Sequence, residues 1–318
     1  MKPNIIAVVG PTASGKTSLG VALAKALNGE VVSADSMQIY QQMDIATAKP
    51  TAEEMQGVMH HLIGFVPVGA SFSVAQYKQL CYACFDDILS RGKMPILVGG
   101  TGLYVDAVIR NTVFPEDADH AAREALSQRY DAEGGEVLLE ELRKVDPDTA
   151  RKLHVKDKKR ILRALEVFTS TGKTLTAQNL ESHTQPVPYQ FCMLILDADD
   201  RAVLYERINR RVDHMVQQGL LQEAEHFFNL PSAGTARQAI GYKELKPYFD
   251  GVCTLEDALE HLKMETRRYA KRQLTWFRRY HDAHRLAIDK LSGDALLAES
   301  LRIIRQETGF FPKEGEPI

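Results

Sequence analysis

GPTASGKT, at residues 10–17, stands between the apolar run IIAVV at 5–9 and a helical pattern at 18–27. The order strand, glycine loop, helix satisfies G-x-x-x-x-G-K-[ST], in which backbone N–H groups surround phosphate oxygens and the lysine adds a positive charge. The final hydroxyl can ligate Mg²⁺, and the N-terminus of the helix adds a favourable dipole. The sequence therefore predicts a diphosphate or nucleotide site at Gly10, Pro11, Thr12, Ala13, Ser14, Gly15, Lys16 and Thr17.

Further apolar runs at 30–34, 95–98 and 191–196 alternate with helical patterns. This alternation is typical of an α/β protein, so we predict a P-loop NTPase-like core with a parallel sheet flanked by helices. Between about residues 114 and 187 only helical patterns occur, which indicates a small all-helical insertion domain. The expected organisation is a core at 1–113 and 189–283, an insertion at 114–188, and a tail at 284–318 whose last ~10 residues are mobile.

Basic charge is concentrated in two segments. The chain has a formal charge of −3, and residues 116–148 carry eleven acids against four bases. Residues 151–166 carry seven bases and two acids, and residues 263–279 carry seven bases and one acid. Such segments are typical of a surface that binds a polyanion, although solvated helix faces would look the same.

Four scattered cysteines indicate no disulfide framework, and no apolar run reaches the length of a membrane span. We expect a cytoplasmic protein without membrane contact.

Asp35 directly follows the second apolar run, and ligand groups of open α/β sheets gather at such strand ends. A single Asp in this place is also common as a helix N-cap, so both interpretations stay open. The run at 95–98 ends in Gly99-Gly100, where many P-loop ATPases carry a Mg²⁺-holding acid, and the chain contains no N-K-x-D sequence. These features count against an ATPase and against a GTPase.

Beyond the loop, a series of motifs resembles the tRNA dimethylallyltransferase (tRNA isopentenyltransferase, IPP transferase) family of the bacterial type. The most specific are DSMQIY at 35–40, GGTGLY at 99–104 and AKRQLTWFR at 270–278, with HHLIG at 60–64 and QAIGYKE at 238–244. The resemblance implies transfer of a dimethylallyl group from dimethylallyl diphosphate to N6 of adenine 37 in tRNAs that read codons beginning with U.

The resemblance also implies roles for individual residues. Asp35 would be the general base, Thr101 would orient the amine, and Lys16 and Arg211 would stabilise the diphosphate, with Mg²⁺ on Thr17. The insertion would hold the anticodon stem-loop of the tRNA. We expect a monomer, although the sequence itself does not give the oligomeric state. Candidate tRNA-binding residues are Asp35, Ser36, Met37, Gln38, Thr101, Arg123, Lys159, Arg160, Ile161, Leu162, Arg163, Arg268, Lys271 and Arg272.

Two alternatives share the loop. A small-molecule or nucleotide kinase would consume ATP and need no RNA, and an ATP-dependent RNA-binding regulator would lack transferase activity. The second would not explain Asp35 beside Thr101. Whether ATP or ADP binds the loop, and what His60 and His61 do, stay open.

Overall fold

The computed structural model describes residues 2–114, 120–230 and 235–309. The chain divides into a larger unit, residues 1–108 with 188–318, and a smaller unit, residues 109–187. The predicted insertion, 114–188, starts five residues later than the smaller unit and ends one residue later. Each unit has a core of its own and is described separately.

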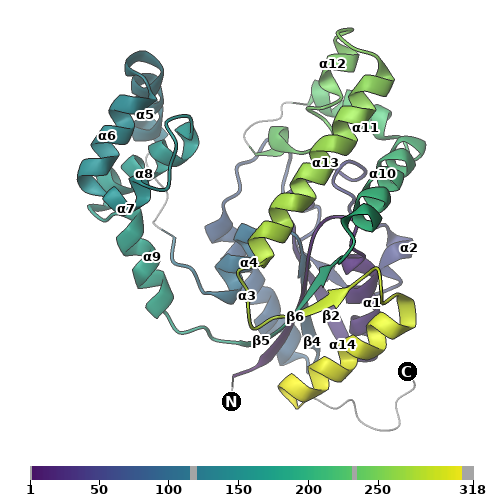
Figure 1. Ribbon diagram of the computed structural model, residues 1–318. Coiled ribbons are helices and arrows are strands. Elements are labelled where there is room, and N and C mark those ends of the chain that lie inside the picture. Colours follow the sequence, from purple (N-terminus) through teal and green to yellow (C-terminus); the bar gives the residue numbers. More distant parts are fainter. Residues whose placement is uncertain (1, 115–119, 231–234, 310–318) are drawn as a thin grey trace. The chain divides into compact units, whose positions relative to one another are not determined.

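The larger unit is built on a parallel sheet, in agreement with the predicted fold class (Figure 1). The described residues form strands in the spatial order β3-β2-β4-β1-β5-β6. Their bounds are β1 Asn4–Val9, β2 Gly29–Ala34, β3 His60–His61, β4 Met94–Gly99, β5 Gln190–Asp197 and β6 His284–Ala287. The four longer strands are the predicted apolar runs, whereas β3 and β6 carry too few apolar residues to be recognised from sequence.

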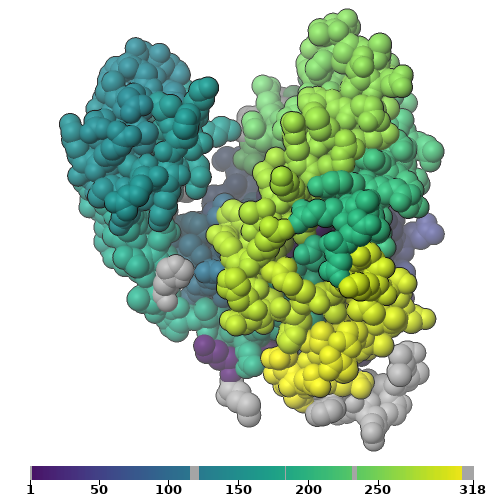
Figure 2. Space-filling model, in the orientation of Figure 1, coloured from purple at the N-terminus to yellow at the C-terminus, as the bar shows by residue number. Residues whose placement is uncertain are grey.

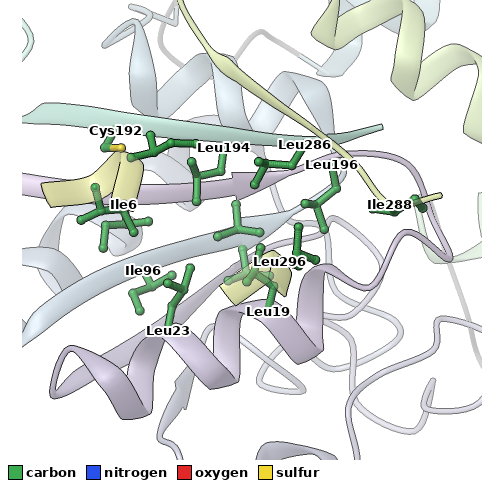
Figure 3. Close-up of a cluster of buried hydrophobic side chains, with 14 of the residues drawn as sticks. Ile6, Leu19, Leu23, Ile96, Cys192, Leu194, Leu196, Leu286, Ile288 and Leu296 are labelled. Atoms are coloured by element: carbon green, nitrogen blue, oxygen red, sulfur yellow. The ribbon is translucent and has the colours of Figure 1, made fainter. Parts of the chain in front are cut away.

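Both faces of the sheet are buried, which explains why the strands read as continuous apolar runs. Alternate residues of a strand point to opposite faces. Ile6 and Val8 of β1 join one core cluster with α1 (Lys16–Ala26) and α14 (Gly293–Thr308), as Figure 3 shows in part. Ile5, Ala7 and Val9 point the other way and are equally inaccessible to solvent.

The remaining helices of this unit are α2 Ala52–Met55, α3 Val74–Ser90, α4 Gly102–Ile109, α10 Arg201–Gln217, α11 Leu220–Asn229, α12 Lys246–Phe249 and α13 Leu255–Phe277. The helix α3 begins after Ser73, whose hydroxyl accepts from the N–H of Gln76 in a capping box, as its sequence indicates. The long helix α13 runs beside α10 (Figure 1). It places residues from the last quarter of the sequence at the carboxyl edge of the sheet.

Residues 284–309 are part of the core, so their assignment to a tail is corrected. The strand β6 pairs with β5, and α14 buries Leu296, Ile303 and Ile304 in the same cluster as β1. Because the recognisable motifs end before residue 283, motif matching alone gives no indication that this stretch joins the core. The expected mobile end at 310–318 lies outside the described residues.

The smaller unit is helical, with α5 His120–Glu133, α6 Gly135–Val145, α7 Pro147–Ala150, α8 Lys158–Thr171 and α9 Leu175–Thr184. Its core joins Leu138, Leu139 and Leu142 of α6 to Ile161 and Leu162 of α8. The side chains of Ile161 and Leu162 are therefore packed inside, which corrects their place among the RNA-facing candidates. At the start of α8 the exposed side chains are the charged ones, such as Lys159 and Arg160.

Candidate active site

Three loops meet at the carboxyl edge of the sheet because β2, β4 and β1 are adjacent and parallel. Asp35 follows β2, Gly100 and Thr101 follow β4, and the loop 10–17 follows β1. Ligand sites of open α/β sheets form at this edge, where the strand order reverses around β1. The sheet thus brings together the phosphate loop and Asp35, which are separated in sequence.

Lys16 and Arg211 supply the positive charge at this edge. The Lys16 ammonium donates to the carbonyl oxygen of Pro11 at 2.5 Å, and the Arg211 guanidinium on α10 donates to the Thr12 hydroxyl at 3.3 Å. Burial, with the neighbouring Arg211 charge, lowers the pKa of Lys16 to about 7, and the Asp35 carboxylate opposes this shift. Burial also lowers the pKa of Arg211. Two half-buried cations near one another are costly unless an anion joins them, which indicates an anionic ligand.

The Asp35 carboxylate is held by the chain that follows it. Its Oδ1 accepts from the backbone N–H groups of Met37 at 2.9 Å and Gln38 at 3.3 Å. A helix N-cap, the alternative role of Asp35, would make the same type of hydrogen bond. No helix begins here, however, because residues 36–39 form turns. Because both bonds use Oδ1, the Oδ2 oxygen remains to accept a proton.

Thr101 lies next to this turn. Its hydroxyl oxygen accepts from the Ser36 N–H at 3.0 Å and the hydroxyl donates to Ser36 Oγ at 3.3 Å. Burial, and to a lesser extent the charge of Asp35, raise the pKa of Tyr269, whose hydroxyl hydrogen-bonds to Thr101. Tyr269 thus stays protonated beside the carboxylate. The pairing of Asp35 with Thr101 expected from sequence is a direct consequence of β2 lying beside β4.

Gln273 was not predicted from the sequence. This buried side chain on α13 accepts from the Thr12 N–H at 2.8 Å and donates to the Gly100 carbonyl at 2.9 Å, so it ties two loops of the site together. One turn further, Trp276 packs against Gly102 so closely that a Cβ there would lie 2.4 Å from the indole. From sequence, the contact of α13 with the loop after β4 could have been inferred only by considering the GGTG and KRQLTWF motifs together.

Two cavities adjoin at Lys16, Thr17 and Arg211. The first, of about 300 Å³, holds Asp35 together with apolar side chains such as Val212 and Leu262. The second, of about 770 Å³, has several basic side chains in its lining, among them Lys16, Lys49, Arg207, Arg210, Arg211 and His214. Lys16 and Arg211 therefore face the same space as the Asp35 carboxylate and an apolar wall. Such a space suits an anion with an apolar group attached.

The basic segments predicted as polyanion surfaces lie on helix faces. Arg268, Lys271 and Arg272 share the solvent side of α13, which runs along the surface in Figure 2. With Trp276 and with Arg279, which follows the helix, they surround a shallow pocket. The Arg279 guanidinium lies 4.1 Å from the centre of the Trp276 ring. The opposite side of the same helix carries Gln273.

In the smaller unit, Arg123 on α5 and Lys159 and Arg160 on α8 are exposed. Lys158 is engaged with both oxygens of Asp131, at 2.7 and 2.6 Å, and Arg163 donates to the buried Glu166 at 3.1 Å. The positive charge that faces solvent at the start of α8 therefore belongs chiefly to Lys159 and Arg160.

The described residues contain no group of three or more His, Cys, Asp or Glu side chains placed to hold a metal. They also contain no helix long and apolar enough to cross a membrane. Mg²⁺, however, commonly keeps several waters and binds through one or two protein oxygens plus substrate phosphates. Thr17, which lines both cavities, offers such an oxygen. The donor set fits a magnesium ion that arrives with a diphosphate.

The lowered pKa of Lys16 predicts proton uptake when diphosphate binds. At pH 8 a group with a pKa of about 7 is mostly neutral, and a bound anion favours its charged form and raises that pKa. Diphosphate affinity should then fall as pH rises from 7, by up to about tenfold per pH unit. Calorimetry of inorganic diphosphate at pH 8, in two buffers of different ionisation enthalpy, measures the uptake. Equal uptake by wild type and Lys16→Met would contradict the assignment.

Comparison with known proteins gives consistent matches. The family model described as IPP transferase matches residues 38–280, and the one described as isopentenyl transferase matches residues 3–67. The tRNA dimethylallyltransferase of Acetivibrio thermocellus is 42% identical over 311 residues, which cover 97% of this chain and 99% of that protein. That of Halalkalibacterium halodurans is 49% identical over 280 residues, covering 87% and 89%.

Solved structures agree with these matches. The full-length tRNA isopentenylpyrophosphate transferase from Bacillus halodurans is 43% identical, with a TM-score of 0.71, covering 96% of this chain and 97% of that one. A eukaryotic dimethylallyltransferase described as acting on tRNA is 29% identical, with a TM-score of 0.74, covering 96% and 77%.

Proposed function

Since the chain belongs to the IPP transferase family, whose curated relatives are named tRNA dimethylallyltransferase, we propose that it transfers a dimethylallyl group from dimethylallyl diphosphate to N6 of adenine 37 in tRNAs reading UNN codons. One observation carries the proposal: Asp35 lines the same cavity as Lys16 and Arg211. A proton acceptor and an anion site are thus present where an alkyl group could pass between them. Since the substrate is tRNA, we place the enzyme in the cytoplasm, and we expect it to act as a monomer.

The main electrostatic task of this reaction is to stabilise the leaving group. As N6 attacks C1 of the dimethylallyl group, the bond from C1 to the diphosphate oxygen breaks and negative charge grows on that oxygen. Lys16, Arg211 and the N–H groups of the phosphate loop are positioned to receive this charge at little cost in reorganisation. Mg²⁺ bound at Thr17 would add charge stabilisation there.

The second task is removal of the proton from N6. The adenine amine is a poor nucleophile, because its lone pair is delocalised into the ring, and it becomes acidic only as the new bond forms. Asp35 Oδ2 takes this proton, while Oδ1 stays bonded to the turn that follows. Thr101, fixed by Ser36, orients the amine.

A base in a stacked loop must be extruded to reach such a cavity, at a cost of a few kcal/mol. Contacts to the tRNA backbone by Arg268, Lys271 and Arg272 on α13, and by Arg123, Lys159 and Arg160 in the helical unit, would offset this cost. These residues carry the RNA-binding part of the proposal.

The direct test incubates the purified protein with labelled dimethylallyl diphosphate and unmodified tRNA, followed by nucleoside analysis. We expect label in N6-dimethylallyladenosine and release of diphosphate, with no requirement for ATP. Phosphorylation of a substrate at the expense of ATP, without RNA, would support the kinase alternative instead.

Salt dependence tests the surface of the helical unit. A plot of log tRNA affinity against log salt concentration has a negative slope. Each phosphate contact that a substitution removes should reduce the magnitude of this slope by about one. We expect Lys159→Gln and Arg160→Gln to flatten this slope, because both side chains are exposed. The matched control is Lys158→Gln, whose charge is already paired with Asp131 and should matter little. Unchanged slopes for Lys159→Gln and Arg160→Gln would remove this segment from the RNA surface.

A further inference from the structure

Glu223 on α11 holds a loop of the active site by its backbone. One carboxylate oxygen, Oε2, accepts from the N–H groups of Asp44 at 2.8 Å and Ile45 at 2.7 Å. The other, Oε1, accepts from the N–H of Ala46 at 2.8 Å and from the Tyr242 hydroxyl at 2.9 Å. Three successive backbone N–H groups thus converge on one carboxylate.

Successive N–H groups that point into a concavity form a site for an anion. Here the anion is a side chain of the same protein, supplied from a position 177–179 residues away. The approach of neighbouring chain is close: Gly241 has a φ of +115°, and a Cβ at that position would lie 2.8 Å from Ala46 Cβ. The loop therefore lies between Glu223, which binds its N–H groups, and Gly241, which packs against Ala46.

The loop held by Glu223 in turn contacts two groups of the active site. The Ala48 carbonyl accepts from the Gln38 side-chain amide at 2.9 Å and from Arg211 Nη2 at 3.5 Å. The Thr47 carbonyl accepts from the same Gln38 amide at 3.2 Å. Ala48 also lines both cavities. A shift of this loop would thus move the acceptors that orient Arg211 and Gln38.

We propose that Glu223 is a positioning residue: its carboxylate acts as a built-in anion for the N–H groups of residues 44–46 and so fixes the carbonyls that orient Arg211 and Gln38. The inference rests on the proposed function for its kinetic consequence, but its structural part concerns diphosphate binding alone. Diphosphate affinity can therefore be measured whether or not the protein transfers a prenyl group.

The first experiment compares Glu223→Gln with Glu225→Gln. The introduced side-chain amide has one acceptor oxygen where the carboxylate had two, so its NH₂ group must face backbone N–H groups that also donate. We expect kcat to fall by about 10–100-fold and the Kd of inorganic diphosphate to rise by about tenfold, while the Kd of tRNA stays within about twofold. Glu225 is exposed on the same helix, so Glu225→Gln, with the same charge change, should keep all three values.

The second experiment is chemical rescue. Glu223→Ala leaves the N–H groups of residues 44–46 and a space where a small carboxylate can bind. Added acetate should restore diphosphate affinity and kcat several-fold in Glu223→Ala, with no effect on wild type or Glu225→Ala. Chloride at equal ionic strength should not restore them. Rescue by acetate separates loss of the anion from a general loss of packing.

The inference is overturned if Glu223→Gln, folded with a wild-type melting temperature, keeps diphosphate affinity and kcat within twofold. It is also overturned if acetate leaves Glu223→Ala unchanged. Should Glu223→Ala fail to fold, Tyr242→Phe tests the same site, because it removes one bond to the carboxylate and should weaken diphosphate binding two- to fivefold. Wild type that binds diphosphate but transfers no prenyl group would refute the proposed function and leave the binding comparison intact.

Discussion

Asp35→Asn should lower the rate of prenyl transfer by about 10²–10⁴-fold, the usual cost of losing a general base. Asparagine keeps the shape of the side chain and an oxygen that can accept from the N–H groups of Met37 and Gln38, so the turn should survive. What it loses is the second carboxylate oxygen and its capacity to take a proton. Single-turnover transfer with saturating enzyme isolates this step from product release.

Equilibrium binding of tRNA and of the prenyl donor should stay within a few-fold in Asp35→Asn. A matched control is Asp213→Asn, an exposed carboxylate on α10, which should transfer at the wild-type rate. If Asp35→Asn kept more than about a tenth of the wild-type rate, a barrier change below roughly 1.4 kcal/mol, Asp35 would only hold the turn. Proton removal would then belong to another group.

Lys16→Ala should both raise KM for the prenyl donor and lower kcat by about 10²–10³-fold, because removing one preorganised donor to a developing charge has this size of effect. As proposed, the ammonium would contact the diphosphate in the ground state and would stabilise more charge in the transition state, so both constants should change. Burial and the neighbouring Arg211 charge lower the pKa of Lys16, so a bound anion is expected to stabilise its charged form.

The control for Lys16→Ala is Lys25→Ala, an exposed lysine in the last turn of the same helix. It should leave both constants unchanged. Loss of tRNA affinity in Lys16→Ala with normal donor kinetics would show that the loop binds RNA instead of diphosphate.

The parts of the site that sequence predicted are local in the chain. The phosphate loop is one continuous motif, and its flanking strand and helix are recognisable because β1 is apolar at every buried position. Asp35 could be singled out because it follows a buried strand, whereas Thr101 was indicated only by the resemblance of its GGTGLY motif to the family. The predicted family, fold class and activity are confirmed by the relatives, while the roles of single residues stay predictions.

The residues that sequence did not find act over long separations. Gln273 reaches Thr12 across 261 positions, and Glu223 reaches the N–H groups of a loop that shows no side-chain pattern. A backbone N–H is the same in every residue except proline, so no motif records which ones a distant carboxylate will bind. The strand β6 was missed because its four residues bury fully only Leu286.

The two faces of α13 constrain which sequence changes this helix can accept. Tyr269, Gln273 and Trp276 lie on the side that contacts the loops, and Arg268, Lys271 and Arg272 lie on the solvent side. One inserted or deleted residue turns everything beyond it by about 100° around the helix axis. Such a change between 268 and 276 would disrupt the inner contacts and the basic surface in a single event. Substitutions can alter either face alone, but changes in helix length can be accepted only outside this segment.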